Sequence, residues 1–200
     1  MHFRILSLFF VFCSVVCSAQ HPDVHKIDLD TCRTFTSIES AMKNPDGVYK
    51  LNLHKMKLKE FPEEILHLSN LLVLDLSKNK LTEIPEEVGE LSHLVEVNLS
   101  KNKIVSFPVG LTQCRFLRKI TLSQNELDSL PPSIGNLSQL EYLDLWSNNL
   151  GYYPNEMKKL VQLKELDLRV INLNKQEQQR ISSLLPNTKI HFSPSCDCAN

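Results

Sequence analysis

Histidine and cysteine are the residues of this chain whose chemistry could support catalysis or metal binding. The seven histidines are scattered and show no H-E-x-x-H or comparable spacing. His21 and His25 are four residues apart, but Pro22 argues against a helix that would bring them together. No G-x-S-x-G motif is present, and no cysteine pairs with a plausible base. The sequence therefore predicts a protein without catalytic activity, cofactor or metal site.

The tail carries two cysteines in a C-D-C sequence, Cys196 and Cys198. They could coordinate a soft metal or form disulfides that link copies of the chain, which would suit an adhesive surface protein. Two ligands alone make no zinc site, so a solvated tail with reducible thiols is the favoured interpretation. The net charge of −1 gives no basic excess that would indicate nucleic-acid binding.

A 23-residue period runs from Val48 to about Arg169. The structural unit that repeats with this period must hold any functional side chain in place. Three residue types keep this step: Leu71, Leu94, Leu117, Leu140 and Leu163; Asn79, Asn102, Asn125 and Asn148; Pro62, Pro85, Pro108, Pro131 and Pro154. A fixed period of this size indicates one supersecondary unit stacked on copies of itself. Such arrays expose long faces rather than deep pockets, which favours binding over catalysis.

Each unit is expected to form a short strand, a turn and a returning segment. The L-x-x-L-x-L spacing places alternate leucines on one face of a strand. The asparagine that follows can satisfy backbone groups left unpaired by the turn, and its repetition would stack such bonds into a column. Proline then fixes φ before a short turn or 3₁₀ piece. Cys114 lies in a column that is otherwise leucine, so we interpret it as a core thiol.

Residues 71–93 match L-x-x-L-x-L-x-x-N-x-L-x-x-[ILF]-P-x-x-[IVL]-G-x-L-x-x throughout, and residues 117–139 match it with isoleucine, Ile120, in place of the second leucine. This pattern resembles the leucine-rich repeat family, in its 23-residue bacterial and plant style. The resemblance implies an α/β solenoid, a right-handed superhelix with a curved parallel β-sheet on its concave side. It also implies short helical or 3₁₀ turns on the convex side, caps at both ends, and a protein ligand held on the concave face.

The ends of the array depart from the repeat. Thr36 and Glu39 read as a capping box that begins a short helix. At the other end Ile171 replaces the repeated asparagine, and a helix from Asn174 leads to an edge strand. We divide the chain into a signal peptide (1–19), an N-terminal cap with a short helix (20–47), five full repeats and a terminal one (48–170), a C-terminal cap of helix and edge strand (171–192) and a flexible tail (193–200).

The first 19 residues resemble a secretory signal peptide. Arg4 precedes an apolar stretch that is too short for a membrane span, and small residues before Gln20 predict cleavage after Ala19. The mature protein would then be secreted, periplasmic or on the cell surface, without membrane insertion. A lipoprotein that uses Cys17 and an uncleaved N-terminal anchor are the alternatives.

The concave face should be lined by the residues that alternate with the strand leucines. Toward the C-terminal end these columns converge on Tyr142, Asp144, Trp146, Glu165, Asp167 and Arg169. Trp146 is the only tryptophan, and tryptophan, tyrosine and arginine dominate interface energetics. Its alternative role is packing against the C-terminal cap. Tyr152 is a second exposed candidate.

We interpret the chain as an exported, non-catalytic module that binds a protein partner through this face. The alternative is an intracellular or membrane-tethered signalling scaffold, since the period also resembles that of Ras-associated leucine-rich repeat proteins. A row of lysines at Lys55, Lys78 and Lys101 could steer an acidic partner, although a solvated edge balanced by nearby glutamates is the favoured interpretation.

Overall fold

The structure, a computed structural model, describes residues 27–194. The predicted signal peptide and both tail cysteines lie outside the described residues. No helix within the described range has the length and apolar character needed to cross a membrane.

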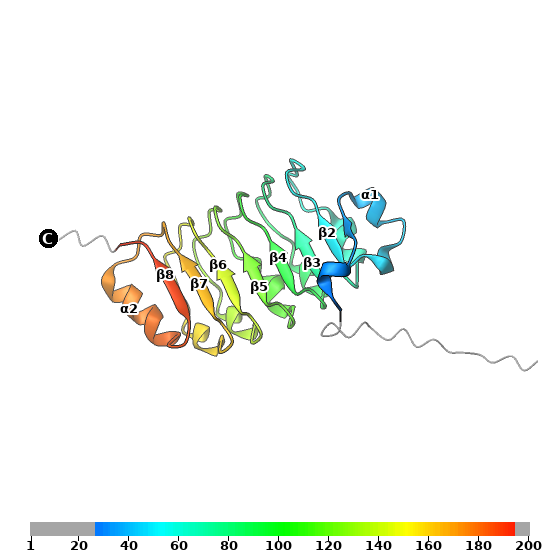
Figure 1. The fold of residues 1–200 in the computed structure, drawn as a ribbon. Helices are drawn as coiled ribbons and strands as arrows, with labels where there is room; N and C mark the ends of the chain where they lie inside the picture. Colours follow the sequence, from blue (N-terminus) through cyan, green and yellow to red (C-terminus); the bar gives the residue numbers. More distant parts are fainter. Residues whose placement is uncertain (1–26, 195–200) are drawn as a thin grey trace, which may run out of the picture.

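One parallel sheet runs the length of the molecule (Figure 1). Its strands follow chain order: β1 (Thr34–Phe35), β2 (Lys50–Asn52), β3 (Val73–Asp75), β4 (Glu96–Asn98), β5 (Lys119–Thr121), β6 (Tyr142–Asp144), β7 (Glu165–Leu168) and β8 (Lys189–Phe192). From β2 to β7 the paired residues are 23 apart, so the register equals the sequence period. This confirms the predicted solenoid of stacked units.

The return segments form short 3₁₀ helices opposite the strands (Figure 1). They are η4 (Glu63–His67), η5 (Glu86–Glu90), η6 (Val109–Gln113), η7 (Pro132–Asn136) and η8 (Asn155–Lys159). Each follows one of the repeated prolines directly, as the sequence predicts. Proline suits this place because its fixed φ matches the chain entering the turn and its missing N–H is not needed there.

The core is a single apolar layer between the strands and the 3₁₀ helices. The strand leucines, exemplified by Leu74 and Leu143, are at most 1% exposed. Cys114 is fully buried among them, and burial raises the pKa of its thiol to about 12. The thiol therefore stays protonated at physiological pH and fills space like the leucines of its column, as predicted.

A ladder of asparagine side chains joins one unit to the next. The Nδ2 of Asn102 donates to Leu76 O at 3.0 Å and to Leu99 O at 2.9 Å, while its Oδ1 accepts from Leu81 N at 3.0 Å. The same three bonds recur, with the register shifted by 23 residues, at Asn79, Asn125 and Asn148. Because each carboxamide bonds the unit before it, the ladder fixes the spacing of the stack.

The residue before each ladder position has a left-handed backbone. These residues are Lys55, Lys78, Lys101, Gln124, Ser147 and Val170, with φ between 55° and 60°. The conformation turns the chain out of the strand, and it is costly for side chains other than glycine or asparagine. The cost is greatest at Val170 because its branched Cβ crowds the backbone. The turn persists there although Ile171 has replaced the ladder asparagine.

The N-terminal cap differs from the sequence prediction in two respects. Ser37, not Thr36, is the N-cap of α1 (Ile38–Ala41), and its Oγ accepts from Ser40 N at 3.2 Å. The capping box with Thr36 and Glu39 is therefore wrong. The reason is that β1 occupies the preceding residues and pairs with β2, so the helix can begin only after Thr36. Two 3₁₀ turns complete this end, η2 (Leu29–Thr31) and η3 (Pro45–Gly47).

The C-terminal end is closed by α2 (Lys175–Leu184) and by β8, which pairs with β7 (Figure 1). Asn174 is the N-cap of α2, and its Oδ1 accepts from Glu177 N at 2.8 Å, as the sequence predicts. Ile171 and Ile181 are both buried beneath this cover. Ile171 has no carboxamide, so the ladder ends at Asn148 and the side chain of Ile171 packs in the core instead.

The ladder predicts that Asn102→Ala will be strongly destabilising. Leu76 O and Leu99 O each keep a second carboxamide donor, from Asn79 and Asn125, but the buried Leu81 N–H loses its acceptor. An orphaned buried donor costs about 2 kcal/mol of unfolding free energy, measurable by urea denaturation. The control Asn149→Ala removes an exposed carboxamide and should change stability by less than about 0.5 kcal/mol. Equal losses from the two variants would contradict a structural role for the ladder.

Candidate functional site: the strand face

The side chains that alternate with the buried leucines form one continuous surface, which we call the strand face. We number the columns by position in the repeat, with the first leucine, such as Leu71, as position 1. The third column reads Lys50, Val73, Glu96, Lys119, Tyr142, Glu165 and Lys189. The fifth column reads Asn52, Asp75, Asn98, Thr121, Asp144, Asp167 and His191. The order from β2 to β7 is the one predicted from the period. Its extension to Lys189 and His191 on β8 is new.

The structure brings six of the seven predicted site residues together at the C-terminal end of this face. We call them the β6–β7 patch: Tyr142, Asp144, Trp146, Glu165, Asp167 and Arg169. Paired strands lie about 4.8 Å apart, so neighbouring side chains of the patch are within contact distance. Tyr142, Asp144 and Trp146 are half-buried and Arg169 is exposed.

The acids of the fifth column bond the backbone of their own strand. Asp144 Oδ1 accepts from Trp146 N at 3.0 Å, and Asp167 Oδ1 accepts from Arg169 N at 3.0 Å. Asn52, Asp75 and Asn98 make the equivalent bond in their units. These side chains therefore stabilise the strand end, a role that the sequence analysis did not assign to Asp144 or Asp167.

Two carboxylates of the patch are paired with cationic or titratable partners. Asp167 accepts three side-chain bonds from Arg169, of which the shortest joins NH2 to Oδ2 at 2.6 Å. Burial opposes ionisation of Asp167, but the hydrogen bonds and charge of Arg169 outweigh it and lower the pKa of this carboxyl. Glu165 Oε1 lies 2.8 Å from Nε2 of His191.

Asp144 differs from these two acids. Burial raises its pKa above the ordinary value, and the negative charge of Asp167 adds to the shift. Hydrogen bonds from Ser123 and the Trp146 backbone and the charge of Arg169 only partly oppose it. The structure shows no ion pair to Asp144 among residues 27–194. Its neighbour Tyr142 also has a raised pKa, first from burial and then from the surrounding carboxylates. The patch is therefore an aromatic surface in which the negative charge of Asp144 is only partly compensated.

The opposite end of the strand face carries different chemistry. His54 Nδ1 lies 2.7 Å from Ser77 Oγ, and Ser77 is only 3% exposed. Lys55, Lys78 and Lys101 are exposed at the left-handed turn positions. Within the strand face, the aromatic side chains are Tyr142 and Trp146, both in the β6–β7 patch.

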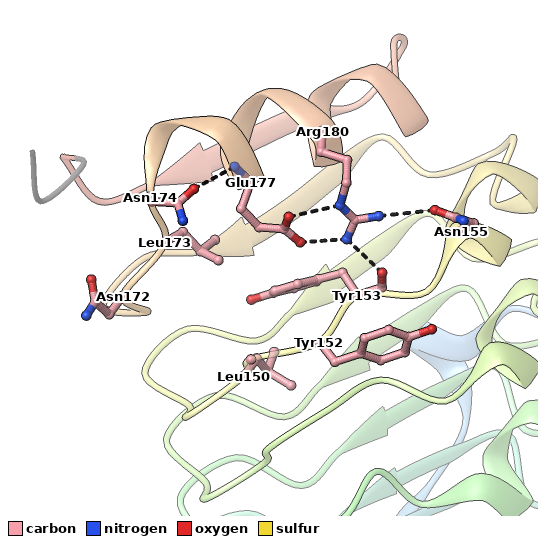
Figure 2. A pocket seen from close by; sticks show the side chains of 10 residues that line it. Leu150, Tyr152, Tyr153, Asn155, Asn172, Leu173, Asn174, Glu177 and Arg180 are labelled. Atoms are coloured by element: carbon pink, nitrogen blue, oxygen red, sulfur yellow. Dashed lines mark hydrogen bonds and ion pairs between the residues drawn. The ribbon is translucent and has the colours of Figure 1, made fainter.

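Tyr152 lies apart from the patch, at a cleft of about 500 Å³ between the last repeat and α2 (Figure 2). Arg180 crosses this cleft with bonds to Glu177 Oε2 at 2.9 Å, to Tyr153 O at 2.8 Å and to Asn155 Oδ1 at 3.1 Å. Its guanidinium therefore fastens α2 to the repeat. Because these polar groups bond one another, we interpret the cleft as a structural joint, with Tyr152 exposed on its rim.

Metal binding finds no support in the described residues: no three or more histidine, cysteine or acidic side chains within residues 27–194 are arranged to hold an ion. Sequence reasoning missed two contacts of the patch. Lys119 Nζ lies 5.6 Å from the ring centre of Tyr142, and His191 pairs with Glu165. Lys119 and Tyr142 occupy the same position in successive repeats, which could have predicted their contact. The alternating pattern of residues 189–192 could have placed His191 on the same face as Glu165.

A leucine rich repeat family model matches residues 46–109 and 115–173, more than half of the chain. A search of curated proteins finds no match. Among solved structures, a leucine-rich repeat protein of Leptospira interrogans is 30% identical with a TM-score of 0.63. The match covers 82% of this chain and 48% of that protein, so this chain spans about half its length.

Two further structures are similar. Internalin C2 of Listeria monocytogenes has a TM-score of 0.62 at 20% identity, with 81% of this chain and 68% of that one covered, and this likeness concerns the fold alone. The BIR3–SERK2 complex of Arabidopsis thaliana has a TM-score of 0.50 at 28% identity, with 74% and 70% covered. The last structure is described as a complex of two proteins.

The contrast between the two patch acids predicts opposite effects of pH on stability. The pKa of Asp167 is lowered on folding, so its stabilising contribution is present above its unfolded value near 3.9 and is lost as pH falls through the folded value. Asp167→Asn should therefore lower the unfolding free energy at pH 7 and lower it less near pH 2.

The pKa of Asp144 is raised on folding, so its ionisation opposes folding as pH rises through and above the unfolded value. Asp144→Asn should raise the unfolding free energy at pH 7 and have no such effect near pH 2. Urea denaturation of both variants at the two pH values measures this. The same sign of change for both at pH 7 would refute the distinction.

Proposed function

The chain belongs to the leucine-rich repeat family, and on that premise we propose that it is an exported, non-catalytic protein that binds a partner protein through the β6–β7 patch. The observation that carries this proposal is the exceptional composition of the patch within a periodic surface. The seventh column holds serine at Ser77, Ser100 and Ser123 but tryptophan at Trp146. A large aromatic side chain that remains half-buried on an open sheet face is suited to contact another protein.

The family and the similar structures support protein binding as the general role. Repeat arrays offer extended surfaces, and the Arabidopsis structure with this fold is a complex of two proteins. The hollow over β3 to β5 of the strand face has a volume of about 150 Å³, which is small for a ligand pocket. A broad surface with a partly exposed aromatic pair near one end favours a protein partner.

Export rests on the sequence of the first 19 residues, which lie outside the described structure. The apolar stretch and the small residues before Gln20 both suit a secreted binding protein.

Removal of the signal peptide predicts a mature chain that begins at Gln20. N-terminal sequencing of the protein purified from its own host measures this directly. The variant Ala19→Arg should retain the leader, because the cleavage site requires a small residue at that position. A native chain that begins at Met1 would refute export and favour the intracellular or membrane-tethered scaffold, while a lipid-modified Cys17 would indicate a lipoprotein.

The double variant Trp146→Ala with Tyr142→Ala should lose most of its capture of the partner. Truncation of an aromatic residue that dominates an interface costs about 2 kcal/mol or more of binding free energy. Each such loss weakens affinity at least about thirtyfold. Both side chains project from the face, so the melting temperature should change by only a few degrees. The measurement is affinity capture from the host's envelope and medium, followed by surface plasmon resonance with the captured protein.

A matched double variant, Glu96→Ala with Ser100→Ala, changes the same two columns two units earlier. It should leave capture unchanged. Equal capture by the aromatic variant and the wild type would refute the β6–β7 patch as the binding site, without affecting the assignment of the fold.

A further inference from the structure

Asp144 occupies a position between two aromatic rings. It alternates with Tyr142 and Trp146, so all three side chains leave β6 and its extension on the same side. One of its oxygens accepts the Trp146 backbone N–H at 3.0 Å. A carboxylate has about four acceptor positions, so acceptor capacity remains for a group arriving from outside.

Asp144 forms no ion pair within the described residues. Asp167 is matched by Arg169 and Glu165 by His191, and both contacts lie on the β7–β8 side of the patch. Asp144 accepts hydrogen bonds from Ser123 and from the Trp146 backbone, and Arg169 stabilises its charge only from beyond ion-pair distance. Burial and the neighbouring carboxylate therefore leave its negative charge incompletely stabilised, and a cation brought by a partner would relieve that cost.

The flanking rings favour a cation as well. Lys119 Nζ already lies 5.6 Å from the Tyr142 ring centre, which shows that the π-system of this tyrosine receives positive charge in the folded protein. Lys119 comes from β5, whereas the neighbouring strand on the other side, β7, presents Glu165 and Asp167. Arg169 is engaged with Asp167, so it does not supply the missing charge to Asp144 by an ion pair.

We propose that Asp144, together with Tyr142 and Trp146, forms a recognition site for a cationic side chain of the partner protein, arginine in preference to lysine. A guanidinium is planar, stacks on aromatic faces and bonds a carboxylate through two N–H groups, whereas an ammonium offers only a point charge. This inference rests on the proposed function. It specifies the partner segment as one with an exposed arginine and few acidic residues beside it.

The single tryptophan makes the test direct, because intrinsic tryptophan fluorescence of the folded chain reports on Trp146 alone. The wild-type protein is titrated with a tetra-arginine peptide at low ionic strength, and with tetra-lysine and tetra-glutamate peptides for comparison. We expect a saturable fluorescence change with tetra-arginine, a weaker one with tetra-lysine and none with tetra-glutamate. Asp144→Asn should weaken tetra-arginine binding about tenfold, as expected for loss of one close charge pair.

Asp144→Asn is suited to this test because asparagine occupies the same column at Asn52 and Asn98, where it accepts the same backbone N–H. The matched control is Asp75→Asn, which also bonds its backbone, at 2.8 Å from Ser77 N, but has no aromatic neighbours in its strand. This control should bind tetra-arginine like the wild type. Equal binding by Asp144→Asn and wild type, or equal loss from the two variants, would overturn the inference.

Partner capture separates this inference from the proposed function. Capture that requires Trp146 and Tyr142 but is unaffected by Asp144→Asn overturns the cationic site and leaves the binding face in place. Capture that is indifferent to the aromatic pair overturns the proposed function itself. Loss of both capture and tetra-arginine binding in Asp144→Asn, with Asp75→Asn unaffected, supports the inference.

Discussion

The asparagine carboxamide is the interaction on which the other features of this molecule depend. Each one bonds two carbonyl groups and one amide, and the carbonyls Leu76 O, Leu99 O and Leu122 O each receive two carboxamides. Neighbouring units are thereby coupled at a fixed spacing, and the buried leucines pack in the same register. The polar groups of the turns are satisfied inside the array, so the strand face needs no particular sequence to remain folded.

That freedom explains why residue types change so much along the strand face while the core columns hardly change. It is limited in the fifth column, where an acid or amide must accept the backbone N–H two residues later. Asp144 and Asp167 both meet this requirement, yet their electrostatic situations differ. Asp167 is neutralised by Arg169, whereas Asp144 keeps a charge that folding does not stabilise. A residue that weakens its own domain at neutral pH is a candidate for function.

Much of this structure could be predicted from the sequence because a period acts as an internal alignment. Leu74 and Asp75 point to opposite sides in their unit, so the residues 23 positions away do the same, and the core role of Cys114 follows from its column. The period gives no information about the structure of the caps beyond its two ends. The cap at Ser37, the short strand before it and the column residues of β8 depend on terminal sequences that occur once. The pairing of Asp167 with Arg169 rather than with a neighbouring strand depends on rotamers, which spacing alone does not determine.

Paired strand residues are one sequence period apart, and this match limits how the number of repeats can change in evolution. Duplication or loss of a whole unit between β2 and β5 would lengthen or shorten the array while leaving Tyr142, Asp144 and Arg169 in the same mutual arrangement. The same event between β6 and β7 would move Arg169 one strand away from Tyr142 and divide the patch. Related proteins that differ in the number of repeats should therefore differ on the N-terminal side of the array. The repeats that carry the β6–β7 patch should stay adjacent to one another.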